Sequence, residues 1–556
     1  MPLTSITAQG AAESGGGRYR LDAELARGGM GVVYRAFDES LGRFVALKRP
    51  TADAMKKKAA LALFQREFLT LSRLRHPRII EAYEYGYDDG VPYYTMELLD
   101  GRDLRALAPL PFREACRYLR DVASSLALLH ARRQLHRDVS PSNVRLTGDG
   151  RAKLIDFGAM TTFGTTGDIV GTPPSIAPEM LRRAALDQRS DLYGLGATAY
   201  WALTGRHAYP ARSLADLEEL WSKGAAARPS AHVHGIPSAL DDLVLSLLHM
   251  DPLARPSSAA EVIERLNTIA HLESEDEAAQ SYLVSPGVIG RAETSKRLGR
   301  RLVRLQHHGK GAAVLIIGHT GVGRTRLLEE LGLDAQLSGL RVVAVDAESC
   351  PETYGVAGAL VEGVFRCVPR AATEAAADAP LALALQFPSF GRVRSRHSHV
   401  PSDPAELRVA LQTALHDWMV AVARKQRLLL LVDNLQQTDE ASLALLTSLS
   451  HEASKKPLFL ALTLRSGEAP VAPSAIAALE QSVEAMMLEP LQREQTHELV
   501  QALFGDVPNV GRLAAWMHDT SGGNPLSCIE FARDIVSKQI ATYHDGSWVL
   551  PQSLPE

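Results

Sequence analysis

Three short motifs, fixed in order and spacing, constrain this chain more than any other feature of its sequence. They read H-R-D-V-S-P-S-N at residues 136–143, D-F-G at 156–158 and A-P-E at 177–179. Transfer of a phosphoryl group to a hydroxyl needs a carboxylate that accepts the proton, and oxygen ligands for Mg2+. The frame therefore predicts that Asp138 accepts the proton and that Asn143 and Asp156 hold the metal.

A glycine-rich segment lies upstream of these motifs. It comes close to the pattern G-x-G-x-x-G-x-V, with Ala26 in place of the first glycine. The residues after its last glycine are β-branched and aromatic and favour a strand, whereas a dinucleotide-binding fingerprint needs a helix there. We expect a β-turn-β flap over phosphates, because a backbone without Cβ approaches phosphate oxygens closely. Its nucleotide-binding residues are predicted to be Ala26, Gly28, Gly31 and Val33.

A lysine follows the glycine-rich segment at strand spacing. Residues 45–48 read V-A-L-K, and the pattern predicts that Lys48 reaches the phosphates. A helix expected around residues 63–74 carries Glu67. We expect Glu67 to pair with Lys48 and orient it toward the nucleotide.

Taken together, residues 18–272 resemble a serine/threonine protein kinase of the bacterial eukaryotic-like branch. The resemblance implies a bilobal kinase fold, ATP and Mg2+, and transfer of the γ-phosphate to Ser or Thr of protein substrates. It implies that Lys48, Glu67, Asp138, Asn143 and Asp156 carry catalysis. It also maps Glu97 and Leu99 to the hinge that binds the nucleotide base.

The resemblance further implies regulation through the segment between the second and third motifs. An arginine directly before the catalytic Asp commonly pairs with a phosphate there, and a phosphate adds about −1.5 to −2 charges. Autophosphorylation, with possible self-association of two chains, is therefore expected. The predicted regulatory residues are Arg137, Thr161, Thr162, Thr165, Thr166 and Thr172, of which Thr172 more readily positions the substrate hydroxyl than receives phosphate.

One departure from the kinase pattern keeps an alternative open. Ser140 stands where such kinases usually carry a lysine that contacts the transferring phosphate. Loss of one donor at a transition state often costs about 3 kcal/mol. The alternative is a pseudokinase or signalling scaffold that binds nucleotide without efficient phosphotransfer.

A second nucleotide-like pattern follows in the chain. A buried-strand run at residues 312–317 leads into G-H-T-G-V-G-R-T and then a helix, the context of a phosphate-binding loop. We expect nucleotide contacts from Gly318, Gly323, Arg324 and Thr325, although Arg324 replaces the usual lysine and is not equivalent to it. A second apolar run ends in Asp433, an expected metal ligand. Asn434 stands next, where a second acid would often assist hydrolysis.

Residues 287–556 thus resemble a signal-transduction ATPase of the AAA/STAND group. Two interpretations stay open: a domain that binds nucleotide with weak or absent hydrolysis, and a degenerate scaffold. A third makes this part the principal enzyme, an ATPase regulated by the kinase-like part.

The patterns predict a multidomain α+β and α/β chain: a bilobal kinase fold, a P-loop NTPase-like α/β domain and a mainly helical C-terminal region. The boundaries we expect are a flexible tail at 1–17, the kinase domain at 18–272, an acidic linker at 273–286, the NTPase-like domain at 287–466 and the helical region at 467–556.

Composition excludes several other classes. The formal net charge is −4, so no global basic field indicates a nucleic-acid partner. No run approaches the roughly 18 apolar residues of a membrane helix. The 4 cysteines are scattered and form no CxxC pair, so we expect a reducing, cytoplasmic location.

Overall fold

The computed structural model describes residues 18–29, 31–74, 76–88, 90–165, 169–272, 287–377, 380–392, 402–544 and 547–551. The expected flexible tail, the acidic linker and Thr166 lie outside these residues. The chain divides into two compact units, one made of residues 1–56, 84–95 and 290–491, and the other of residues 57–83, 96–289 and 492–556. We describe each unit by itself.

The first unit contains an antiparallel sheet in the order β1-β2-β3-β5-β4, apart from the end residues of β4 and β5. Its strands are β1 (Tyr19–Arg27), β2 (Gly31–Asp38), β3 (Arg43–Pro50), β4 (Ala82–Asp88) and β5 (Val91–Met96). Ala36, Val45, Leu47 and Tyr93 form a small buried cluster on one face. A short helix, α1 (Ala52–Met55), follows β3.

The same unit contains a parallel sheet in the order β11-β12-β13-β10-β14. Its strands are β10 (Ala312–Gly318), β11 (Arg341–Asp346), β12 (Leu428–Asp433), β13 (Leu458–Arg465) and β14 (Glu484–Met487). Every residue of β12 is buried, as expected for a central strand covered on both faces. The short edge strand β14 pairs with β10, so the sheet extends past the boundary expected at residue 466. The first and last residues of this strand, Glu484 and Met487, are exposed. The strand therefore has no continuous buried apolar run that the sequence could reveal.

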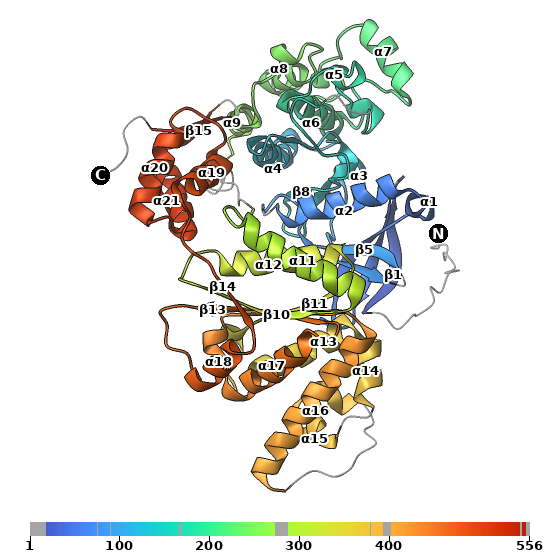
Figure 1. The fold of residues 1–556 in the computed structure, drawn as a ribbon. Coiled ribbons are helices and arrows are strands. Elements are labelled where there is room, and N and C mark those ends of the chain that lie inside the picture. Colours follow the sequence, from blue (N-terminus) through green and yellow to red (C-terminus); the bar gives the residue numbers. More distant parts are fainter. Residues whose placement is uncertain are drawn as a thin grey trace, which may run out of the picture. The chain divides into compact units, whose positions relative to one another are not determined.

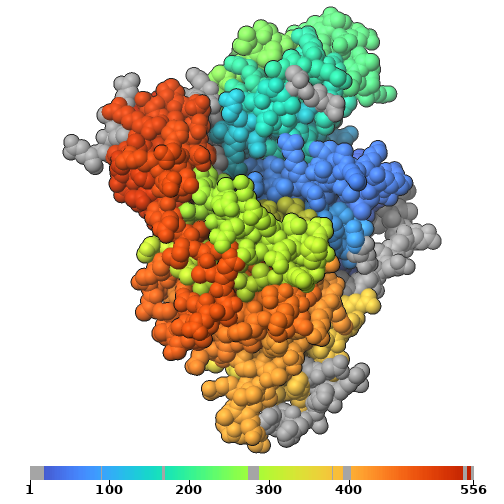
Figure 2. All heavy atoms as spheres, in the orientation of Figure 1, coloured from blue at the N-terminus to red at the C-terminus, as the bar shows by residue number. Residues whose placement is uncertain are grey.

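Helices cover both faces of the parallel sheet (Figure 1). On one face lie α11 (Ala292–His308) and α12 (Arg324–Leu337), whose outer sides form the yellow-green surface in Figure 2. The other helices of this domain are α13 (Gly355–Cys367), α14 (Pro369–Ala376), α15 (Leu381–Gln386), α16 (Pro404–Lys425), α17 (Glu440–Ala453) and α18 (Pro473–Glu480), with 3-10 turns η5 (Ala347–Ser349), η6 (Pro388–Arg392) and η7 (Leu435–Gln437).

The second unit is mainly helical. Its longer helices are α2 (Lys58–Ser72), α4 (Phe112–Ala131), α6 (Gln188–Thr204), α7 (Leu214–Ser222), α8 (Ser238–Leu247) and α9 (Ala259–Ala270). Its short elements are α3 (Leu104–Leu107), α5 (Pro178–Leu181), η1 (Pro141–Asn143), η2 (Pro173–Ser175), η3 (Pro229–Ala231), η4 (Pro252–Ala254), β6 (Gln134–Leu135), β7 (Val144–Leu146), β8 (Ala152–Leu154) and β9 (Thr161–Thr162). Most of α6 is buried, because α4 and α8 pack against it.

The C-terminal residues of this unit are helical, with one small hairpin. They form α19 (Arg493–Phe504), α20 (Val510–Ser521) and α21 (Pro525–Ser537), followed by β15 (Thr542–His544) and β16 (Ser547–Val549). The Asn524 side chain accepts hydrogen bonds from the first turn of α21, and Pro525 at the first position suits a helix start. The predicted fold class, an antiparallel sheet with helices, a parallel α/β domain and a helical C-terminal region, is confirmed.

Among the described residues, no helix is both long enough and apolar enough to span a bilayer.

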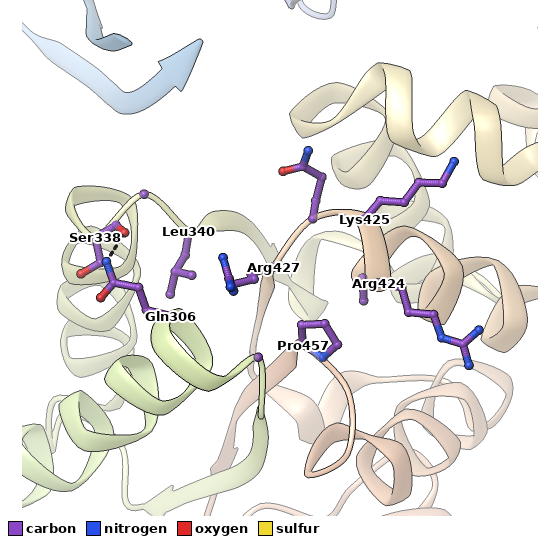
Figure 3. A pocket seen from close by; sticks show the side chains of 11 residues that line it. Gln306, Ser338, Leu340, Arg424, Lys425, Arg427 and Pro457 are labelled. Atoms are coloured by element: carbon purple, nitrogen blue, oxygen red, sulfur yellow. Dashed lines mark hydrogen bonds between the residues drawn. The ribbon is translucent and has the colours of Figure 1, made fainter. Parts of the chain in front are cut away.

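A polar cavity of about 440 Å3 lies at the amino-terminal edge of the parallel sheet (Figure 3). Gln306 donates to the Ser338 carbonyl at its rim, over 2.8 Å. Its basic residues do not converge, since Arg424 and Lys425 point away from Arg427. Ligands of open parallel sheets bind at the opposite, carboxyl edge, so this cavity is not the predicted nucleotide site.

Candidate active site

The glycine-rich segment joins β1 and β2 as a tight turn in the first unit. The backbone N–H of Gly28 donates to the Gly31 carbonyl over 2.9 Å. A Cβ on Gly31 would lie 3.0 Å from the Arg49 carbonyl oxygen and 3.1 Å from Lys48 Cε, so no larger residue fits without displacing them. Ala26 pairs with Val33 across the hairpin, as the β-turn-β prediction requires. A strand begins at Gly31, where a dinucleotide-binding fingerprint would need a helix.

Lys48 lies in the middle of β3 in the same unit. It pairs in register with Val33 of β2, which places it directly behind the glycine turn. Its Nζ lies 5.9 Å from the centre of the Tyr94 ring. Glu67 lies on α2 in the second unit, buried beside Phe64 and Phe68. The Lys48–Glu67 pair joins residues of different units and stays a prediction.

Asp138 lies in the loop between β6 and β7, and both of its carboxylate oxygens accept hydrogen bonds. The amide of Asn143 donates to Asp138 Oδ2 over 2.9 Å and to the Asp138 carbonyl over the same distance. Thr172 donates to Oδ1 from its backbone N–H and from its hydroxyl, each over 2.9 Å. These bonds fix the orientation of a carboxylate that the sequence predicts to be the proton acceptor.

The conformation of this loop is supported from below by Asp191 of α6. Its buried carboxylate accepts from the backbone N–H groups of His136 and Arg137 over 2.9 and 2.8 Å, and faces His130 Nε2 at 2.9 Å. Burial alone would raise the pKa of Asp191, but these partners hold the pKa below its ordinary value. Arg137 has φ +68°, and such left-handed conformations persist where surrounding bonds hold them.

Asn143 and Asp156 supply a set of oxygen donors that suits Mg2+. The Asn143 carbonyl accepts from the N–H of Ile155, which ties the catalytic loop to the start of the D-F-G motif. Because the Asn143 amide nitrogen serves Asp138, its Oδ1 is the side-chain atom that remains for a metal. Asp156 is exposed and has φ +64°, while Phe157 beside it is buried against the His136 ring. Amide and carboxylate oxygens are the ligands that Mg2+ prefers.

The predicted hinge residues have different surroundings. The Glu97 carboxylate forms an ion pair with Lys153 of β8, at 2.6 Å, and its backbone N–H donates to the Glu81 carbonyl. Leu99 is buried. Sequence reasoning missed the Lys153 pair, because nothing in the motifs joins a residue three positions before D-F-G to the hinge.

Ser140 offers no cation at the catalytic loop. Its side chain is fully buried, and its Oγ lies 3.1 Å from the Ser142 Oγ. Ser140 is therefore packed inside the loop, whereas the usual lysine would extend out of the loop.

The segment after D-F-G carries the predicted regulatory threonines. Thr161 and Thr162 form β9, which pairs with Leu135 and Gln134 of β6, one residue before the H-R-D motif. Thr162 is exposed, and the Thr165 hydroxyl donates to its carbonyl over 2.6 Å. This short pairing brings the threonines to the strand that leads directly into Arg137.

The first unit holds the second nucleotide-like site at the carboxyl edge of the parallel sheet. The chain turns from β10 into α12 through Gly318 and Gly323, and Gly323 has φ +97°. A Cβ on Gly318 would lie 2.7 Å from Val322 Cγ1, so the close turn requires glycine. Thr325 donates to Asp433 Oδ2 over 2.6 Å, and Thr463 donates to the other oxygen. The residues predicted for this site are therefore together.

Arg324 replaces the usual lysine without leaving the site. The residue is buried, with a relative exposure of 6%. Burial lowers the pKa of Arg324, and Asp433 partly offsets this effect. Among the described residues its buried Nη1 has no hydrogen-bond partner. A buried cationic donor beside a helix N-terminus suits an anionic ligand such as a nucleotide phosphate.

Comparisons with known proteins match a family model to each of the two segments that carry these predicted sites. Residues 19–266 match the model of the protein kinase domain, and residues 287–461 match that of the AAA ATPase domain. The serine/threonine-protein kinase PknL of Mycobacterium bovis is 34% identical over 262 residues, which cover 46% of this chain and 66% of PknL. PksC of Streptomyces coelicolor, also a serine/threonine-protein kinase, is 32% identical over 304 residues, which cover 51% of this chain and 53% of PksC. The chain thus spans less than two thirds of the length of either relative. The predicted order, a kinase domain followed by an AAA-type domain, is confirmed.

Proposed function

We propose that this chain, which carries a protein kinase domain at residues 19–266 and an AAA ATPase domain at residues 287–461, is a serine/threonine protein kinase with a nucleotide-binding regulatory domain. It transfers the γ-phosphate of ATP to Ser or Thr of proteins, including its own chain. The observation that carries the proposal is the Asp138 carboxylate, oriented by Asn143 and Thr172.

The chemistry follows from this arrangement. The oxygen of the substrate hydroxyl bonds to the γ-phosphorus while Asp138 accepts the hydroxyl proton. ADP leaves with the electrons of the broken P–O bond. Thr172 and Asn143 keep the carboxylate oxygens in place, so little reorganisation is needed at the moment of transfer. Lys48 binds phosphate oxygens and Glu67 orients it. Mg2+, held by Asn143 and Asp156, supplies charge neutralisation for the phosphates when bound.

Regulation is part of the proposal. A phosphate on Thr161, Thr162, Thr165 or Thr166 would pair with Arg137 and order the segment between D-F-G and A-P-E. Since a chain cannot easily place its own segment in its own site, transient self-association of two chains supports this step. We place the protein in a reducing cytoplasm, since none of its 4 cysteines forms a disulfide.

We propose domain boundaries at 18–272 for the kinase domain and from 287 for the ATPase-like domain, with the acidic linker between them. The pairing of β14 with β10 supports carrying the second domain past residue 466. We propose that this domain binds nucleotide at Gly318, Gly323, Arg324 and Thr325, with Asp433 toward the metal, and acts as a sensor.

The scaffold alternative rests on Ser140 alone. The comparisons do not favour it, since the relatives reported above are named as kinases. The test is transfer of labelled γ-phosphate from ATP to generic protein substrates, followed by identification of the phosphorylated residue type. Label on Ser and Thr supports the proposal. Label on neither, with intact nucleotide binding, would contradict it and favour the scaffold.

A further inference from the structure

The carboxyl edge of the parallel sheet contains a second acid that the motifs did not single out. β11 and β12 run parallel in register, so Asp346, the last residue of β11, lies beside Asp433, the last residue of β12. Asn434 follows Asp433 and occupies the position where a second acid would often assist hydrolysis. Its side-chain amide nitrogen donates to Asp346 Oδ1 over 3.0 Å.

The orientation of the Asn434 amide is set from both sides. Its Oδ1 faces two donors, Gln436 Nε2 and Arg465 Nη2, each at 3.4 Å. Its backbone N–H donates to Thr463 Oγ1 over 3.0 Å, and its φ is +55°. The side chain is buried, so it cannot turn away into solvent. The nitrogen therefore has to point at Asp346.

This geometry explains why position 434 carries an amide. A carboxylate there would place an acid oxygen about 3 Å from the Asp346 carboxylate, and two like charges at that distance repel strongly. The pair holds one acid and one amide, and the acid stands on β11. The second acid of the site is thus at residue 346 and not at residue 434.

The other acids near this edge are already engaged. Asp433 accepts from Thr325 and Thr463. Glu348 pairs with Arg465 over 2.8 Å, and Glu468 pairs with the same guanidinium over 3.0 Å. Asp346 is exposed and, among the described residues, the two hydrogen bonds to its carboxylate both reach Oδ1, from Asn434 and from the N–H of Glu348. Its Oδ2 is the carboxylate oxygen that remains for a water.

We infer that Asp346 is the proton acceptor for hydrolysis of a nucleoside triphosphate at this site, and that Asn434 is its positioning residue. The inference rests on the proposed nucleotide binding at the phosphate loop. The water oxygen bonds to the γ-phosphorus, the bond to the bridging oxygen breaks, and the diphosphate leaves with its electrons. Asp346 takes the water proton and passes it to solvent, so the products are nucleoside diphosphate and inorganic phosphate.

The test uses the full chain with Asp138→Asn, which silences phosphotransfer, and measures both ATP hydrolysis and binding of a fluorescent ATP analogue. We expect slow hydrolysis in this background. Adding Asp346→Asn should lower kcat by about 100-fold or more, the usual contribution of a general base, with KM and analogue affinity unchanged. Glu374→Gln is the matched control. Glu374 forms a surface ion pair with Lys425, which precedes β12 and so lies away from the carboxyl edge of the sheet, and the change should alter neither quantity.

A swap variant separates chemistry from structure. Asp346→Asn combined with Asn434→Asp keeps one amide and one acid in contact but returns the acid to position 434. We expect hydrolysis to recover at least tenfold over Asp346→Asn alone. A merely structural role for Asp346 would give no such recovery, and that result would overturn the inference.

The outcomes also separate this inference from the proposed function. Because the kinase domain binds the analogue as well, a stoichiometry of one analogue per chain that Arg324→Met leaves unchanged would contradict nucleotide binding by the second domain. Binding without hydrolysis before Asp346 is changed, or hydrolysis that is unaffected by Asp346→Asn, would overturn the role of Asp346 and leave the sensor proposal standing.

Discussion

Thr172 donates two hydrogen bonds to a single oxygen of Asp138, one from its backbone N–H and one from its hydroxyl, each over 2.9 Å. Asp138 belongs to the H-R-D motif and Thr172 to the segment between D-F-G and A-P-E, so this contact closes that segment onto the catalytic loop. Because Asn143 holds the other oxygen, the carboxylate has one orientation available to it.

Loss of the Thr172 hydroxyl should lower the rate and leave the fold intact. Thr172→Val keeps the shape and the backbone hydrogen bond but removes a bond to a charged group, worth about 1.5–3 kcal/mol. We expect kcat for phosphotransfer to fall about 10- to 100-fold. Thr172→Ser keeps the hydroxyl and should stay within about threefold of the original rate. Equal rates for the Val and Ser variants would show that the hydroxyl does not matter.

Lys48→Met should abolish phosphotransfer. The change removes a cation at the centre of β3, behind the glycine turn, without removing its aliphatic stem. We expect a loss of at least about 100-fold in kcat, as for other single donors to a charged transition state. The control is Lys223→Met, at an exposed site paired with Glu219. Phosphotransfer at the original rate in Lys48→Met would rule out the assigned role.

The A-P-E glutamate should matter for stability. Glu179 and Arg255 form a buried two-bond ion pair at 2.7 and 2.9 Å, and Ser190 also donates to Glu179. Glu179→Gln leaves the Arg255 charge buried without its counter-ion, which costs about 3–5 kcal/mol.

Urea unfolding measures this loss. Glu219→Gln, in the exposed pair with Lys223, is the control and should change the free energy of unfolding by less than about 1 kcal/mol. A loss for Glu179→Gln as small as the control would mean that the buried pair does not stabilise this region.

Low pH should weaken the hydrogen bonds between the Asp191 carboxylate and the catalytic loop. The pKa of Asp191 is held below its ordinary value of about 3.9, so its ionised form stabilises the folded state. That contribution is complete above the ordinary value and is lost as the pH falls through the lower, folded-state pKa. Stability measured by urea unfolding should therefore drop below about pH 4. In Asp191→Asn the drop should be shallower and the stability at pH 7 lower; an unchanged acid profile would contradict this.

The sequence predicted the chemistry of the kinase site better than its supports. The H-R-D and D-F-G patterns locate Asp138, Asn143 and Asp156, because phosphoryl transfer needs those groups at near-fixed spacing. The Lys153–Glu97 pair was missed, since it joins residues with no motif in common. Such contacts depend on the fold, so spacing along the chain carries no sign of them.

In the second domain, too, the sequence predicted some features and missed others. Strands of continuous apolar residues, such as β12, were visible in the sequence because both of their faces are buried. The edge strand β14 was not, because it is short and mostly exposed. The sequence also located Asn434 as a departure, yet only the pairing of β11 with β12 reveals Asp346 as its partner.

The most direct test of the kinase proposal is the intact mass of the full chain after it has been dephosphorylated and then incubated with Mg2+ and ATP. Asp138→Asn, incubated in the same way, is the control. We predict added phosphates on the original chain and none on the variant, with sites that digestion maps to the threonines between D-F-G and A-P-E. Equal phosphate addition on both proteins, or none on either protein and none on added substrates, would contradict the proposal.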